Sequence, residues 1–484
     1  MPQRRGRMAE GNAQPDGRAF AHWHQAIERS NQLLAERKPK LALQVTQRAL
    51  RDFPHNTELL RRHAKTAERL VSNDPDHATR YADIALEHYS QAARAEPANA
   101  STAAGLARLL DRRGDRDRAR AVLLPHLDGS PPDRDVAMAF AALAPRFGEI
   151  ERAIALIERA IGQRETSQLR HVQARLLDRA GRYDQSFAAA ERANELVGRH
   201  YDETGFREGA LATTVDAISA ATPRTAMLAA GTARRRSDLP VFIVGMGRSG
   251  TTLVEQIISG HPQAAGAGER RALLNAVTSI AEATGTGFPS GLCRWPVDAL
   301  DRVHDRYVAE LQALAPGAIR ISDKLPQNFL RLGVIQRLLP GARIIHTQRN
   351  PLDVCLSAYY QDQKIPAMEP WDLYRAGLCY RDYERMMAHW RSVLDVQVLD
   401  VQYENLVARP EVEARRIIAF LELPWDERCL AVEKNTRVVD TSNYEAVRRP
   451  IHSDAVGRWR HYEQQLTPLM RALGGRARDG SAIP

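Results

Sequence analysis

Residues 239–260 read LPVFIVGMGRSGTTLVEQIISG. The first seven residues form a continuous apolar run, which is typical of a β-strand buried on both faces. Gly245 and Gly250 then bracket a turn with the spacing G-x-x-x-x-G, and a helical pattern follows it directly. Between a strand and a helix, this spacing is typical of a phosphate-binding loop, whose backbone N–H groups and helix N-terminus form a cradle for an anion. The segment predicts an α/β fold with an anion site at the end of its first strand.

Strand and helix patterns continue to alternate after this loop. Further strands are expected at 318–322, 342–347 and 396–403, and helices at 327–339, 351–361 and 371–394. This alternation predicts a parallel sheet covered by helices on both faces, with ligands bound at the carboxyl ends of the strands. We assign residues 239–484 to this domain.

One residue separates this loop from those of nucleotide-hydrolysing proteins. Those loops have lysine after the second glycine, to hold the β- and γ-phosphates, whereas this chain has Thr251. No apolar strand ending in a clear magnesium-binding aspartate stands out either. Arg248 supplies a cation from inside the loop instead. The loop is expected to bind an anion but to be poorly equipped for phosphoryl transfer with magnesium.

The first half of the chain has a different pattern. Residues 19–198 are rich in Ala, Leu, Arg and Glu, with apolar residues at helical spacing. Three segments align on Gly114, Gly148 and Gly181, at intervals of 34 and 33 residues; a small residue follows each glycine by five positions and a leucine precedes it by five. This period resembles the tetratricopeptide repeat, a pair of antiparallel helices per unit, and predicts an all-helical array. Such an array either presents a concave surface to a peptide or protein, or only supports the α/β domain or a homodimer.

The flanking segments and the composition add further expectations. Residues 1–18 are expected to form a disordered tail and residues 199–238 a linker. The net charge of +9 favours an anionic partner, but the scattered arginines form no basic tract interleaved with aromatic residues, so nucleic acid is not expected. The four cysteines have no metal-ligand spacing and no apolar stretch approaches a membrane span, which favours a cytoplasmic protein.

A second anion site is expected after the strand at 342–347. Asn350 is a good N-cap, and Pro351 suits the first position of a helix. Arg349 then lies at the strand end, and Ser357 lies two turns into the helix and could face the same way. An arginine and a hydroxyl beside a helix start can hold a phosphate dianion. The alternative for Arg349 is a structural ion pair with a carboxylate.

These motifs resemble a known family. VFIVGMGRSGTTL resembles the 5′-phosphosulfate loop of sulfotransferases that use 3′-phosphoadenylyl sulfate (PAPS), especially tyrosylprotein sulfotransferases and their bacterial relatives with tetratricopeptide repeats. The resemblance covers residues 239–473 and implies PAPS as donor and adenosine 3′,5′-bisphosphate (PAP) as product. The spacing of Arg349 and Ser357 matches the family's 3′-phosphate motif, which distinguishes PAPS from ATP. The resemblance assigns the 5′-phosphosulfate to Arg248, Ser249, Gly250, Thr251 and Thr252.

Sulfuryl transfer is expected to be an in-line displacement, with a base at the acceptor hydroxyl, a cation at the leaving oxygen and in principle no metal. Glu269 is the expected base, because it follows Arg248 by 21 residues, as in tyrosylprotein sulfotransferases. Gly268 stands where those enzymes have another glutamate. The alternative is that Glu269 caps the next helix. Lys324, beside a proline after a strand, resembles the family's lysine and is expected at the leaving oxygen.

Four further residues are assigned by the resemblance. Arg271 matches an arginine near the acceptor, and Tyr403 matches a strand-end tyrosine near the donor. Arg448 and Arg449 resemble a basic loop that closes over the donor, although which of them reaches it is open. The alternatives are core packing for Tyr403 and a solvated turn for the two arginines.

The acceptor stays open among a peptide or protein tyrosine, a carbohydrate hydroxyl, a lipid headgroup and a small molecule. A P-loop kinase or ATPase that requires magnesium and ATP is one rival function. An inactive scaffold whose repeat array binds a protein is another, although the presence of Glu269 and Lys324 argues against it. His261 and His346 are alternative bases, for which a structural role is the plainer interpretation.

Overall fold

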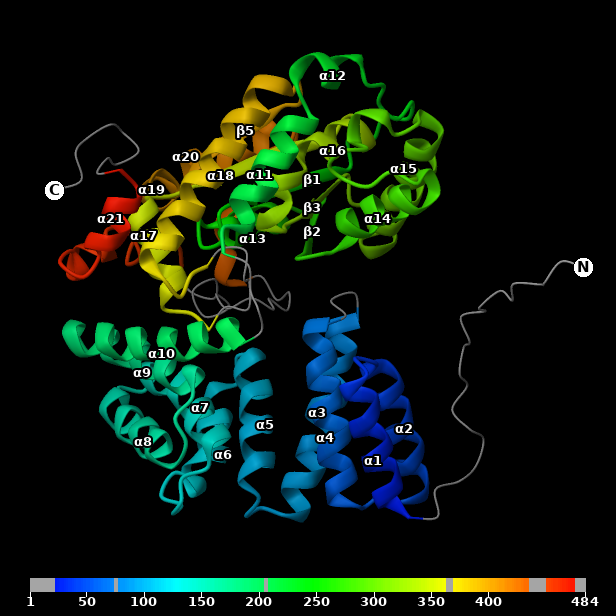
Figure 1. Ribbon diagram of the computed structural model, residues 1–484. Helices are drawn as coiled ribbons and strands as arrows, with labels where there is room; N and C mark the ends of the chain where they lie inside the picture. The colour runs from blue at the N-terminus through cyan, green and yellow to red at the C-terminus, as the bar shows by residue number, and fades with distance from the viewer. Residues whose placement is uncertain (1–21, 74–76, 204–207, 363–368, 435–449, 475–484) are drawn as a thin grey trace, which may run out of the picture. The chain divides into compact units, whose positions relative to one another are not determined.

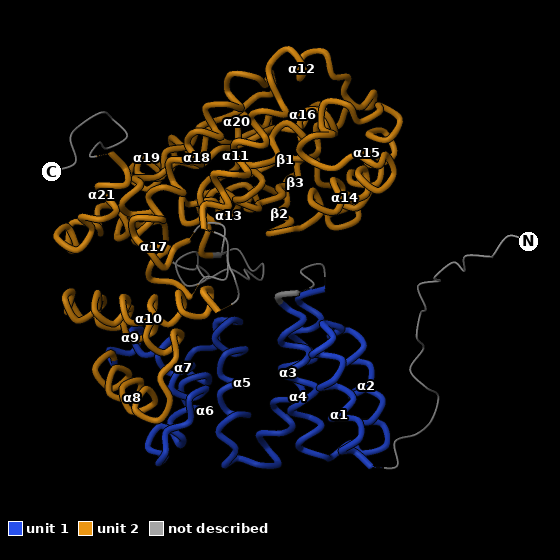
Figure 2. Tube along the Cα trace, viewed as in Figure 1, with its two compact units in different colours: residues 1–149 blue, residues 150–484 orange. Residues whose placement is uncertain are grey.

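The computed structural model of the chain describes residues 22–73, 77–203, 208–362, 369–434 and 450–474. Its contacts divide the chain into two compact units, residues 1–149 and residues 150–484 (Figure 2). The expected tail, residues 1–18, lies outside the described residues. Within the described ranges, no helix has both the length and the apolar character needed to cross a membrane.

The first unit contains the larger part of the expected helical array, whose last helices belong to the second unit (Figure 1). Buried leucine and alanine side chains, including Leu33, Ala42 and Leu59, form a core shared by its first three helices. Its α-helices are α1 (Trp23–Ala35), α2 (Pro39–Asp52), α3 (Thr57–Asn73), α4 (Ala78–Ala95), α5 (Ala100–Arg112), α6 (Arg116–Leu123) and α7 (Arg134–Leu143).

The repeat residues pack as the sequence pattern predicts. The turn glycines have left-handed backbones, with φ of 85°, 70° and 74° at Gly114, Gly148 and Gly181. Glycine adopts this conformation without the cost that a side chain brings. The small residue five positions after each glycine is fully buried, and the leucine five positions before each is at most 3% exposed. These residues are Ala119, Ala153 and Ser186, and Leu109, Leu143 and Leu176.

The second unit begins with the last helices of the repeat region and continues into the sheet domain. Its α-helices are α8 (Ile150–Gln163), α9 (Ser167–Arg179), α10 (Tyr183–Glu203), α11 (Ala210–Ala221), α12 (Arg224–Ala229), α13 (Thr251–Ser259), α14 (Ala272–Thr284), α15 (Val297–Leu314), α16 (Leu332–Leu338), α17 (Pro351–Tyr359), α18 (Leu373–Val393), α19 (Tyr403–Ala408), α20 (Pro410–Phe420) and α21 (Thr467–Ala472). Short 3-10 helices include η5 (Pro326–Arg331) and η10 (Arg458–Tyr462).

The segment expected to be a linker, residues 199–238, is partly regular structure. It holds the end of α10 together with α11 and α12, and α11 packs against α18. Leu211, Val215 and Ile218 of α11 are buried, and their i, i+4, i+7 spacing places them on one face of the helix. The stretch therefore contributes to the core of the second unit as well as connecting two sequence patterns.

A five-stranded parallel sheet with the order β2-β3-β1-β4-β5 confirms the predicted fold class. The strands are β1 (Pro240–Gly245), β2 (Ala264–Gly268), β3 (Arg320–Asp323), β4 (Arg343–Gln348) and β5 (Val398–Gln402). Four of them agree with expected strands to within a few residues. The sequence pattern missed β2, because AAGAG has none of the β-branched or aromatic residues that mark strands.

Helices cover both faces of the sheet (Figure 1). On one face, Val241 and Ile243 of β1 pack with Val254 of α13 and Ile417 of α20. On the other face, the Phe242 ring lies 6.1 Å, between centroids, from the ring of Tyr307 in α15. The central strands are thus buried on both sides, and their carboxyl ends carry the polar residues.

Candidate active site

All five strands carry an assigned residue at or just beyond their carboxyl ends. Glu269 follows β2, Lys324 follows β3, Arg248 lies in the loop after β1, Arg349 follows β4 and Tyr403 follows β5. Because the strands are parallel, these ends share one edge of the sheet. The strand order therefore separates the site into Glu269 and Lys324 on one side of the phosphate loop, and Arg349 and Tyr403 on the other.

The phosphate loop is tightly built. Arg248 has a left-handed backbone with φ of 74°, and Gly250 has φ of 99°. A Cβ atom on Gly250 would lie 2.6 Å from the ring of Tyr403, so no larger residue fits there without movement. The Ser249 hydroxyl lies 2.7 Å from both the Met246 carbonyl oxygen and the Thr347 hydroxyl. The side chain of Ser249 therefore braces the loop, and Thr251 and Thr252 begin α13 as buried residues.

The Arg248 side chain joins the second anion motif. Its Nε donates to the Ser357 hydroxyl at 2.9 Å, and Arg349 Nη1 donates to the Arg248 carbonyl oxygen at 3.0 Å. The Arg349 guanidinium also lies 4.7 Å from the centroid of the Tyr403 ring. Burial, and then the neighbouring charge of Arg349, lower the pKa of Arg248 to about 10. The guanidinium groups of Arg248 and Arg349 therefore lie close together although their positive charges repel each other. An anion bound between them would offset this repulsion.

One donor of Arg349 has no hydrogen-bond partner within the part of the chain that the structure describes. Arg349 is only 7% exposed, and its Nε is buried without a hydrogen-bond partner among the described residues. Such a buried donor is costly unless something accepts from it. A neighbouring cavity of about 230 Å³ is lined by residues that include Arg248, Thr252, Arg349, Ser357, Tyr403 and Arg458. The surroundings of Arg349 therefore fit an anionic ligand.

The expected N-cap of α17 is confirmed. The Asn350 side chain accepts a hydrogen bond from the Leu352 N–H at 2.9 Å.

Glu269 and Lys324 contact each other directly. Lys324 Nζ donates to Glu269 Oε1 at 2.5 Å, and the Lys324 N–H donates to the Gly268 carbonyl oxygen at 3.0 Å. Lys324 is completely buried, whereas the Glu269 side chain is 46% exposed. Arg271, and not Glu269, takes the N-cap position of α14, and it does so without a side-chain cap. The capping alternative for Glu269 is therefore wrong, and the exposed Arg271 lies two residues from the ion pair.

Asp323 ends β3 beside this pair. It is completely buried, and Tyr307 Oη donates to its Oδ2 at 2.6 Å. Burial raises the pKa of Asp323 to about 7. A carboxyl that is enclosed in this way helps to hold the loop that carries Lys324.

The comparisons with known proteins agree with this geometry. Residues 240–427 match the family described as the Sulfotransferase family. A putative protein-tyrosine sulfotransferase of Caenorhabditis briggsae is 30% identical over 202 residues, which cover 39% of this chain and 68% of that protein. The chain belongs to the sulfotransferase family.

Two further comparisons give more limited similarity. An uncharacterized protein of Aquifex aeolicus is 33% identical over 310 residues, 62% of this chain, but the match spans only 40% of that protein's length. The sulfotransferase domain of the Synechococcus PCC 7002 olefin synthase is 22% identical, with 48% of this chain and 90% of that chain covered and a TM-score of 0.36. The family match and the Caenorhabditis briggsae relative confirm the family predicted from the sequence motifs.

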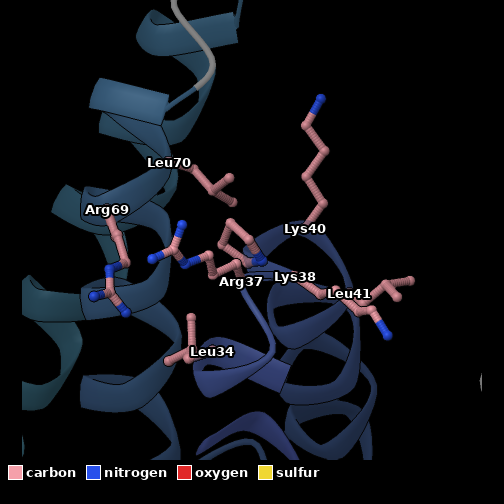
Figure 3. Close-up of a pocket in the computed structure, with 8 residues that line it drawn as sticks. Leu34, Arg37, Lys38, Lys40, Leu41, Arg69 and Leu70 are labelled. Carbon is pink, nitrogen blue, oxygen red and sulfur yellow. The ribbon is translucent and has the colours of Figure 1, made fainter. Parts of the chain in front are cut away.

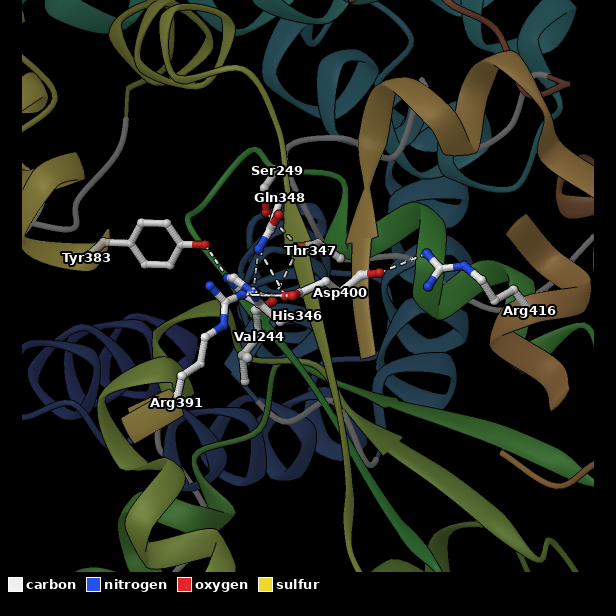
Figure 4. A network of polar contacts seen from close by, with 9 residues as sticks. All are labelled: Val244, Ser249, His346, Thr347, Gln348, Tyr383, Arg391, Asp400 and Arg416. Atoms are coloured by element: carbon white, nitrogen blue, oxygen red, sulfur yellow. Dashed lines mark hydrogen bonds and ion pairs between the residues drawn. The ribbon is translucent and has the colours of Figure 1, made fainter. Parts of the chain in front are cut away.

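The two histidines considered as bases have structural partners in the sulfotransferase domain. His346 is completely buried; its Nδ1 lies 2.6 Å from Asp400 Oδ1, and its Nε2 bonds to the hydroxyl of Tyr383 (Figure 4). This network ties β4 to β5 and α18. His261 is also buried, and its Nε2 lies 2.8 Å from the Pro424 carbonyl oxygen.

Sequence reasoning missed two residues that line the cavity of the sulfotransferase domain, Asp353 and Arg458. Asp353 accepts from the backbone N–H groups of Gly457 at 2.7 Å and Trp459 at 3.0 Å. It thereby holds the segment that carries Arg458, which lines the cavity. Asp353 lies inside the motif that the sequence analysis considered, but nothing local indicates its partner 104 residues later. Arg448 and Arg449 lie outside the described residues.

Proposed function

We propose that this chain transfers a sulfuryl group from PAPS to an acceptor hydroxyl. The observation that carries the proposal is the buried Arg349, whose Nε has no described protein partner and which lies beside Arg248, Ser357 and a cavity at the end of the sheet. An anion with a second phosphate at this place would account for this arrangement, because a phosphate dianion offsets the positive charges of Arg248 and Arg349 that meet beside the cavity.

The strand order supports an allocation of the donor along the sheet edge. The backbone of residues 248–252 and the N-terminus of α13 would hold the 5′-phosphosulfate. Arg349 and Ser357, two strand positions from Lys324, would hold the 3′-phosphate. Tyr403 would line the donor between Gly250 and Arg349, with which its ring is in contact.

The proposed chemistry is one displacement at sulfur. The acceptor oxygen forms a bond to sulfur, its proton passes to Glu269, and the bond from sulfur to the bridging phosphate oxygen breaks. Lys324 stabilises the negative charge on that leaving oxygen, and PAP is released. Because Lys324 and Glu269 now contact each other at 2.5 Å, the two must separate for each to serve its own end of the reacting group.

Two features argue against the kinase or ATPase alternative. Thr251 occupies the position of the phosphate-loop lysine. Asp323 does end a strand next to β1, but it is completely buried, bonded to Tyr307 and adjacent to Lys324. It is therefore a poor magnesium ligand.

For the acceptor and for a protein partner we propose only a chemical class. The acceptor is a hydroxyl of a peptide, protein, carbohydrate or small molecule, and Arg271 would lie near it. The first unit offers a place for an acidic, partly apolar protein segment, because a cavity of about 730 Å³ combines basic and leucine side chains (Figure 3). These are Arg37, Lys38, Lys40, Arg69, Leu34, Leu41 and Leu70.

A thermal-shift titration with PAP, and separately with magnesium and ATP, tests the donor class. A ligand at about 100 times its Kd stabilises the folded state by about 2.7 kcal/mol. We expect a shift with PAP that Arg349→Ala removes and that the milder Ser357→Ala reduces. The exposed Arg460→Ala, which removes the same charge outside the cavity, is the matched control.

The two other possible outcomes of the titration would each favour a different function. A shift with magnesium and ATP alone would refute the proposal in favour of the kinase. The absence of a shift with either ligand would favour the inactive scaffold.

A further inference from the structure

Helix α9 of the repeat region is joined to the sulfotransferase domain by a group of polar contacts within the second unit. Asp178 of α9 accepts from Arg458 at 3.1 Å (Nε) and 3.0 Å (Nη2), and from Tyr462 Oη at 2.5 Å. Arg175, one turn earlier, donates to the Tyr360 carbonyl oxygen at 3.1 Å. The repeat region therefore reaches the two segments that border the donor cavity, the end of α17 and η10.

Arg458 is held in a defined orientation by these contacts. The Nε and Nη2 atoms of Arg458 both contact the Asp178 carboxylate. The Arg458 guanidinium also lies 4.6 Å from the centroid of the Tyr360 ring. Its side chain is 23% exposed, and it lines the same cavity as Arg349 and Ser357. An arginine fixed in this way loses little conformational freedom when it binds a phosphate.

The charge balance around the cavity favours a dianion. The charges of Arg349, Arg175 and Arg458 all act on Arg248 and, after burial, lower its pKa. Asp353, the carboxylate that lines the cavity, is already engaged by two backbone N–H groups. The cations around the cavity thus outnumber the carboxylate that lines it.

We propose that helix α9 of the repeat region completes the donor site, with Asp178 positioning Arg458 so that Arg458 binds the donor's 3′-phosphate beside Arg349 and Ser357. The inference rests on the proposed function. Arg458 is a binding residue, and Asp178 is a positioning residue that acts through it. On this view the last repeat is part of the donor site and not an appended interaction module.

Isothermal titration of the full chain with PAP and with adenosine 5′-monophosphate, which lacks the 3′-phosphate, tests the inference. A charge-assisted hydrogen bond of the usual strength predicts that Arg458→Ala weakens PAP binding by about 10- to 100-fold. The same variant should leave the monophosphate affinity within about twofold. Arg460→Ala, a neighbouring exposed arginine that does not line the cavity, should bind both ligands as the wild type does.

The Asp178→Asn variant separates positioning from folding. The asparagine oxygen can still accept from Tyr462, so the helix contact is kept while the charge that orients Arg458 is lost. We expect a smaller loss of preference for PAP over the monophosphate, and no additional loss when Arg458→Ala is combined with it.

Three results would overturn the inference. Wild-type PAP affinity in Arg458→Ala would do so, as would an equal loss of both ligands, because the 3′-phosphate would then not be the group bound. A wild-type chain that does not bind PAP at all would overturn the proposed function as well. If instead the wild type binds PAP and Arg458→Ala binds it equally well, only the inference about Arg458 fails and the proposed function stands.

Discussion

Replacement of Glu269 by glutamine tests the proposed base with little change of shape. The amide oxygen of glutamine can still accept from Lys324, which now donates to Glu269 at 2.5 Å, while the basic carboxylate is lost. Because Lys324 is completely buried but the Glu269 side chain is 46% exposed, we expect a loss of stability of at most about 2 kcal/mol, below the roughly 3–5 kcal/mol typical of a broken buried pair. General-base catalysis contributes roughly 10²–10⁴-fold to rate, or about 3–5 kcal/mol of activation free energy.

The assay is single-turnover transfer of labelled sulfate from PAPS to an acceptor found by screening, together with PAP binding by titration. We expect kcat to fall within that range and the Kd for PAP to change by less than about threefold. Glu411→Gln is the control, because it also removes a carboxylate from an ion pair, with Arg415 at 2.8 Å on the outside of α20. Wild-type turnover in Glu269→Gln would refute the assignment, and a parallel loss of PAP binding would show a role in donor binding instead.

Three further predictions concern the loop, the buried acid and the repeat. Gly250→Ala should destabilise the fold by about 1–3 kcal/mol in urea unfolding and weaken PAP binding, because φ is 99° and the new Cβ would lie 2.6 Å from the Tyr403 ring. The stability of the wild type should fall as pH rises from about 4 to 7, because the pKa of Asp323 is raised from 3.8 to about 7 by burial, and thermal melts should show this slope reduced in Asp323→Asn. Ala119→Leu should lower stability by about 1–3 kcal/mol in circular-dichroism melts, because Ala119 is fully buried where α5 and α6 pack.

The sequence predicted the strand-end residues well for a simple physical reason. In a parallel sheet all carboxyl ends lie at one edge, so a polar residue just beyond an apolar run is placed at that edge by chain direction alone. The same local logic placed the turn glycines and the small residues of the repeat. It failed at β2, whose alanines and glycines carry no strand signal, and at α11, whose apolar stripe lies in a segment taken for a linker.

The sequence by itself thus determined the family, the fold class and the residue types at the site, because these depend on local spacing and on the direction of the chain. Only the tertiary structure decided which of them meet. The contact of Lys324 with Glu269, the bond of Arg248 to Ser357 and the pairing of Asp178 with Arg458 join residues 55, 109 and 280 positions apart. Such contacts arise from the order of the strands and from the packing of α9 against the sulfotransferase domain. Neither can be predicted from a local sequence pattern, because both depend on segments far apart in the chain.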